Sequence, residues 1–66
     1  MKANKIIYFL EKDQKGKWKG NHGLAVYAET QDDLWEQVKQ FQKGTNRKMM
    51  GIANCTADYN HNTLIG

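Results

Sequence analysis

Hydrophobic and polar positions follow a strand-like pattern in the first part of the chain. Residues 5–11, KIIYFLE, are rich in β-branched and aromatic side chains and predict a strand. A polar stretch follows, in which Gly16 suits the left-handed position of a hairpin loop. Residues 17–28 then predict a second strand. We expect a kink or bulge between residues 20 and 23, because glycine inside a strand weakens pairing.

The apolar spacing then changes to that of a helix. Leu34, Val38 and Phe41 recur at intervals of four and three, the period of an amphipathic helix lying on a core. We therefore predict a helix over residues 31–43. Gly44 suits its C-terminal cap.

The remaining apolar runs complete an α+β fold. Residues 49–57, MMGIANCTA, predict a third strand, and residues 63–65, TLI, can add a short fourth. The order is ββαβ, or ββαββ with the final strand. It predicts a single domain over residues 1–66, with one helix packed on one face of an antiparallel sheet of three or four strands.

Both faces of the first two strands carry apolar side chains. Since one helix covers one face of a small sheet, the other face would be open in a monomer, and exposed apolar patches usually mark interaction surfaces. We expect Ile7, Phe9, Ala25 and Tyr27 to share the open face and to bind a protein or a second copy. The alternative is that chain ends and lysine stems cover this face.

The acids before the helix have a structural explanation. Thr30 at the N-cap and Asp33 three residues later form a variant capping box, and Asp32 and Asp33 both lie in the first turn, where the helix dipole favours negative charge. A catalytic pair would need a base, metal or nucleophile converging on it, and the sequence shows none. We expect no enzyme activity and no catalytic residue.

Composition narrows the remaining options. Cys55 is the only cysteine among 66 residues, so no internal disulfide can form, and a reducing cytoplasm is expected. His22, Cys55 and His61 lack the spacing of metal ligands, and we expect no metal and no cofactor. The apolar run of residues 6–10 is too short for a signal peptide or a membrane span.

The net charge of +3 leaves a nucleic-acid or acidic partner open. Basic residues interleaved with an aromatic side chain can follow a phosphate backbone and stack a base. Lysines at a hairpin tip also prevent edge-to-edge aggregation. Because Trp18 alternates with two lysines, we expect it to face the core, which favours a solvated basic face. The candidate contacts are Lys15, Lys17, Trp18, Lys19, Arg47 and Lys48.

Residues 5–43 resemble the small HicB-like domains. The run Glu11, Asp13, Gly16 and Trp18, followed by AETQDDLWEQV, is similar to their acidic strand end, glycine hairpin, aromatic second strand and capped helix. Glu29 stands where that family usually has a glycine. Proteins of this family are antitoxins that bind and mask an RNA-cleaving toxin, and the resemblance implies a binding module without catalysis.

Residues 27–33, YAETQDD, also resemble a strand-to-helix junction of small podophage RNA polymerase inhibitors, and anti-CRISPR proteins share this size and plan. The resemblances imply a protein that inhibits or masks a nucleic-acid-handling enzyme. The alternative from the residues is a small basic nucleic-acid-binding domain that uses the lysine-rich first hairpin. Self-association as a homodimer is a further alternative for the open face.

Overall fold

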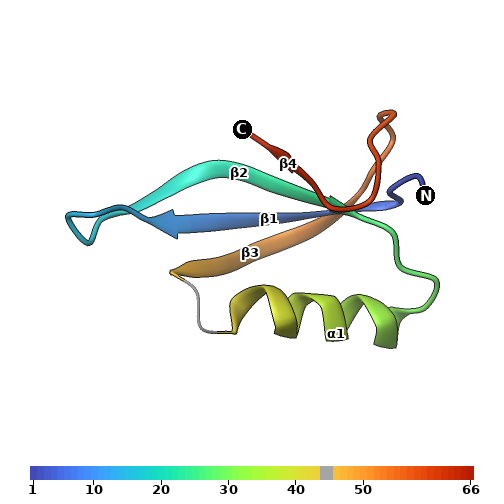
Figure 1. The fold of residues 1–66 in the computed structure, drawn as a ribbon, viewed down its shortest axis with the longest axis horizontal. Helices are drawn as coiled ribbons and strands as arrows, with labels where there is room; N and C mark the ends of the chain where they lie inside the picture. Colours follow the sequence, from blue (N-terminus) through green and yellow to red (C-terminus); the bar gives the residue numbers. More distant parts are fainter. Residues whose placement is uncertain (44–45) are drawn as a thin grey trace.

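A computed structural model describes residues 1–43 and 46–66, apart from the side chain of Asn21. The elements are β1 (Lys5–Lys12), β2 (Trp18–Val26), α1 (Gln31–Gln42), β3 (Arg47–Asn54) and β4 (Thr63–Ile65). The strands form an antiparallel four-stranded sheet in the order β3-β1-β2-β4, and α1 runs alongside β3 (Figure 1). The predicted α+β class with one helix is therefore confirmed.

Strand pairing differs somewhat from the prediction. An isolated bridge between Lys2 and Asn60 adds a further antiparallel pairing beside the four strands. The third strand begins at Arg47 and ends at Asn54, earlier at both ends than predicted. Its first residues are polar, and the pairing of Arg47 with Glu11 brings them into the sheet.

The expected irregularity in β2 is present. Phe9 pairs with His22 and Glu11 with Lys19, so three steps along β2 match two along β1. Such a bulge bends the strand and increases its twist. The hairpin beyond it closes with Gly16 at φ 82°, in the left-handed region that favours glycine, as the sequence predicts.

The helix begins as its sequence predicts. Thr30 Oγ1 accepts a hydrogen bond from Asp33 N at 3.1 Å, and Asp33 Oδ2 accepts one from Glu29 N at 3.2 Å. The second bond goes to the residue before the N-cap, whereas the Glu or Gln of the usual capping box bonds the N-cap N–H itself. The helix ends with Lys43 as C-cap. The predicted cap Gly44 lies outside the described residues.

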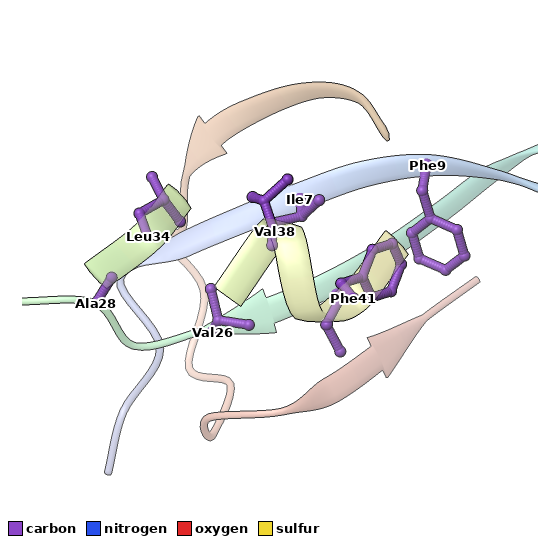
Figure 2. Close-up of a cluster of buried hydrophobic side chains, with 8 residues drawn as sticks. Ile7, Phe9, Val26, Ala28, Leu34, Val38 and Phe41 are labelled. Atoms are coloured by element: carbon purple, nitrogen blue, oxygen red, sulfur yellow. The ribbon is translucent and has the colours of Figure 1, made fainter. Parts of the chain in front are cut away.

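The core lies between α1 and one face of the sheet. Leu34, Val38 and Phe41 point from the helix toward strand residues such as Ile7 and Phe9 (Figure 2). The rings of Phe9 and Phe41 meet edge to face, with centroids 4.8 Å apart, a preferred aromatic geometry. The helix stripe predicted from the sequence is thus core.

Asn4 fixes the connection between β2 and α1. Its side-chain amide donates to Ala28 O at 2.7 Å, and its side-chain oxygen accepts from Ala28 N at 2.9 Å. Its backbone N–H also donates to Val26 O. The paired bonds hold the chain at the point where it leaves the sheet for the helix.

Candidate functional site

The face of the sheet away from α1, which we call the outer face, is formed largely by residues other than those predicted. Ile7 is 0% exposed and Phe9 is 2% exposed, and both pack in the core against the helix. Their predicted place on the open face is therefore wrong. The sequence shows that odd and even positions of β1 face opposite ways, but both sets are apolar, so alternation alone could not show which set faces the helix.

Ala25 and Tyr27 do not form a common surface with Ile7 and Phe9. Ala25 lies on the outer face, opposite Thr63 of β4, but it is fully buried. Tyr27 follows the end of β2, is half-buried, and donates its backbone N–H to His61 Nδ1 at 2.9 Å. Its carbonyl oxygen accepts a bond from Gln37. The four predicted residues therefore lie in three different environments.

The outer face carries a different set of apolar side chains, which we call the apolar patch. Even-numbered residues of β1 alternate onto this face, and Met50 from the bulge of β3 and Ile65 from β4 join them. Tyr59 completes the patch from the β3–β4 loop. A hollow of about 540 Å³ lies among these residues, namely Ile6, Tyr8, Leu10, Met50, Tyr59 and Ile65.

Two glycines explain the hollow beside Tyr8. Tyr8 pairs with Gly23 on β2 and with Gly51 on β3, so neither directly opposite neighbour has a side chain. A Cβ on Gly51 would meet nothing within 4 Å, whereas one on Gly23 would lie 3.1 Å from Ile6. The Tyr8 side chain is consequently 46% exposed, although it stands on a central strand.

The loop that supplies Tyr59 is tied to the N-terminus. Ala3 N donates to Tyr59 O at 2.9 Å, and His61 N donates to Met1 O at 2.8 Å. Lys2 also forms an ion pair with Asp58. These contacts hold the long β3–β4 connection against the start of β1, so Tyr59 reaches the outer face although it is distant in sequence from Tyr8.

The first hairpin is basic and structured. Asp13 Oδ1 accepts hydrogen bonds from the backbone N–H groups of Lys17 and Lys15, both at 2.9 Å. The bond from Lys17 makes the largest contribution to lowering the pKa of Asp13, and Lys15 and the charge of Lys19 act in the same direction. The aspartate therefore shapes the loop that carries the lysines.

The prediction that Trp18 faces the core is wrong. It is 47% exposed, with the Lys12 ammonium 5.8 Å from its ring centroid. The prediction from alternation fails because Trp18 pairs with Lys12, three residues past Phe9, the last residue of β1 in the core cluster. The hairpin runs on past the end of α1 (Figure 1). The hairpin therefore presents an aromatic ring together with its lysines.

Arg47 and Lys48 do not act as a pair. The Arg47 guanidinium lies 3.3 Å from Glu11 and 4.9 Å from the Phe41 ring centroid, at the end of the core. Lys48 pairs with Leu10 in the sheet and is exposed. Arg47 therefore has a structural role, while Lys48 borders the apolar patch.

The remaining polar candidates, Asp33 and Cys55, are engaged in local hydrogen bonds. The carboxylate of Asp33 is engaged in the helix cap, and the Cys55 thiol donates to Ala57 O. Among residues 1–43 and 46–66, no group of three or more histidine, cysteine, aspartate or glutamate side chains is arranged to hold a metal ion. Over the same residues, no helix has both the length and the apolar character needed to cross a membrane.

Comparisons with protein-family models, with curated proteins and with solved structures find no match to this chain.

Proposed function

We propose that this chain is a non-enzymatic protein-binding module that inhibits or masks a nucleic-acid-handling enzyme, with the apolar patch as its docking surface. The observation that carries the proposal is the exposed Tyr8 ring between two glycines, beside the exposed Met50. Large aromatic side chains dominate the energetics of protein interfaces, above all where a hollow admits a partner side chain.

Charge around the patch supports a partner protein with an acidic border. Lys48 of β3 pairs with Leu10 of the apolar patch, and the basic hairpin projects from the same end of the sheet. With a net charge of +3, the chain would be repelled by the basic surface on which an enzyme holds phosphates. The positive charge of the chain therefore fits docking on an apolar area of the enzyme that is flanked by carboxylates, beside the phosphate-binding surface. It does not fit a mechanism in which the chain imitates nucleic acid.

The class of partner comes from the resemblance to antitoxins and phage inhibitors over residues 5–43 and 27–33. We place the module in the cytoplasm, where its single thiol would stay reduced. A protein partner is favoured over a second copy, because the lysines that border the patch would repel one another across a symmetric dimer.

Site-specific cross-linking tests the proposal. A photoreactive benzoylphenylalanine placed at position 8, in cells that produce the protein, should cross-link to one nucleic-acid-handling enzyme, whose turnover the purified chain then inhibits. The matched control is the same residue at position 35, because Trp35 is 49% exposed on α1. Cross-links at position 8 only to a second copy, or equal cross-linking at both positions, would contradict the proposal.

A further inference from the structure

The β1–β2 hairpin forms a projecting arm. Residues 12–19, which we call the basic arm, begin level with Arg47 at the start of β3, and the hairpin projects from there past the C-terminal end of α1 (Figure 1). Its loop is held in shape by the Asp13 hydrogen bonds and by the left-handed Gly16. The arm is thus a preformed surface, and binding through it would cost little conformational entropy.

The arm carries uncompensated positive charge. It contains Lys12, Lys15, Lys17 and Lys19, and its one acid, Asp13, is engaged in the loop. The Lys19 ammonium lies 3.8 Å from the Asp13 carboxylate. In the part of the chain that the structure describes, the other three arm lysines form no ion pair. The nearby Glu11 pairs with Arg47. Both acids near the arm therefore have structural partners.

An aromatic ring stands among these charges and on the same face as Tyr8. Trp18 pairs directly with Lys12, and residues directly opposite in an antiparallel pair point to the same face. Because Lys12 lies two alternation steps from Tyr8 along β1, both belong to the outer face. Lys12, the partner of Trp18, lies four positions along β1 from Tyr8, roughly 13 Å.

We propose that the basic arm binds single-stranded nucleic acid, with its lysines on the phosphates and Trp18 stacked on a base. Lysines alone would hold any polyanion, but an exposed ring among lysines adds the stacking that unpaired bases offer. Bases in a duplex are stacked on one another, so their faces are not accessible to the ring. This inference goes beyond the protein-binding function, because it assigns the arm lysines and Trp18, which lie outside the apolar patch, to nucleic acid.

Fluorescence anisotropy with a labelled oligothymidylate of about 20 nucleotides tests it, since single-strand-binding folds cover roughly 4–16 nucleotides. Trp18→Ala should weaken binding by about tenfold or more, the loss that base stacking predicts. Trp35→Ala removes the other tryptophan, equally exposed but on α1, and should leave affinity unchanged. Circular dichroism establishes that each variant is folded.

Salt dependence tests the lysines. The double variant Lys15→Gln/Lys17→Gln should reduce the slope of log affinity against log salt by about 1.4, since each phosphate contact on a single strand contributes about 0.7. The control Lys39→Gln/Lys43→Gln makes the same change in net charge, at exposed residues in α1 and at its C-cap, and should reduce the slope by less than half that amount.

Four outcomes would overturn the inference. The first is that poly-glutamate of matched charge binds as tightly as the oligothymidylate does, because this would indicate a surface for acidic proteins. Another is preference for a duplex. The third is an equal effect of the Trp18 and Trp35 variants. The fourth is binding without quenching of the Trp18 fluorescence in a Trp35→Phe background, because a base stacked on the ring should quench it.

Discussion

Tyr8 and Phe9 are neighbours on β1 whose side chains lie on opposite faces, and replacing each in turn tests the assignment of those faces. Phe9 is almost completely buried and contacts the rings of Phe41 and His22. Truncation of a buried phenylalanine to alanine costs about 3–5 kcal/mol. A domain of this size has roughly 3–5 kcal/mol of net stability, so Phe9→Ala should be largely unfolded at room temperature.

Tyr8→Ala should have a much smaller effect. Complete burial of a large apolar side chain contributes about 1.5–3 kcal/mol, and about half of the Tyr8 side chain is buried. The expected loss is about 1 kcal/mol, equivalent to a fall in Tm of about 4–8 °C for a small domain.

The assay is thermal and urea unfolding followed by circular dichroism. Phe9→Leu and Tyr8→Leu provide a milder pair in case Phe9→Ala cannot be purified, and Phe9→Leu should again be the less stable of the two. Equal losses at both positions, or a larger loss at Tyr8, would show that the helix does not cover the odd-numbered face of β1.

The remaining predictions concern the helix cap, the hairpin and its pH dependence. Thr30→Ala removes the acceptor for Asp33 N and should cost about 1 kcal/mol in a urea melt, without loss of partner binding; unchanged stability would contradict the cap. Gly16→Ala places a Cβ at φ 82° and should cost about 1–2 kcal/mol by the same assay, and a neutral result would show that the loop relaxes. Because folding lowers the pKa of Asp13, its stabilising effect is complete above the unfolded value of about 3.9 and disappears as pH falls through the lower folded value. The protection of the Lys15 and Lys17 amides from exchange, taken relative to an unstructured chain at the same pH, should therefore fall at acid pH, and Asp13→Ala should remove that dependence; an unchanged protection profile in the variant would assign it to another group.

Elements with a strong local signal were predictable from the sequence. The helix has a clear apolar period and a capping pair, Thr30 and Asp33, whose hydrogen bonds depend on residues close in sequence. The hairpin turn is likewise local, since Gly16 and Asp13 act within a few residues of each other. Both were placed correctly to within about two residues, the usual uncertainty of element ends.

Features that depend on distant contacts were not predictable. The side of β1 that α1 covers is decided by tertiary packing, and with Ile6, Ile7, Tyr8 and Phe9 all apolar the pattern carries no preference. The hollow at Tyr8 needs the pairing of β1 with both Gly23 and Gly51, which no local pattern shows. Even the sequence alternation at Trp18 misleads, because the hairpin extends past the core.

Inhibition of the cross-linked partner is the most direct measurement of the central claim, that the apolar patch holds a nucleic-acid-handling enzyme. Turnover of that enzyme should fall to a low plateau as the wild-type chain is added. Tyr8→Ser should shift the midpoint of the titration by tenfold or more, as expected for an aromatic residue at the centre of an interface. Trp35→Ser should leave the midpoint unchanged. Full inhibition by Tyr8→Ser at the wild-type midpoint would contradict the account.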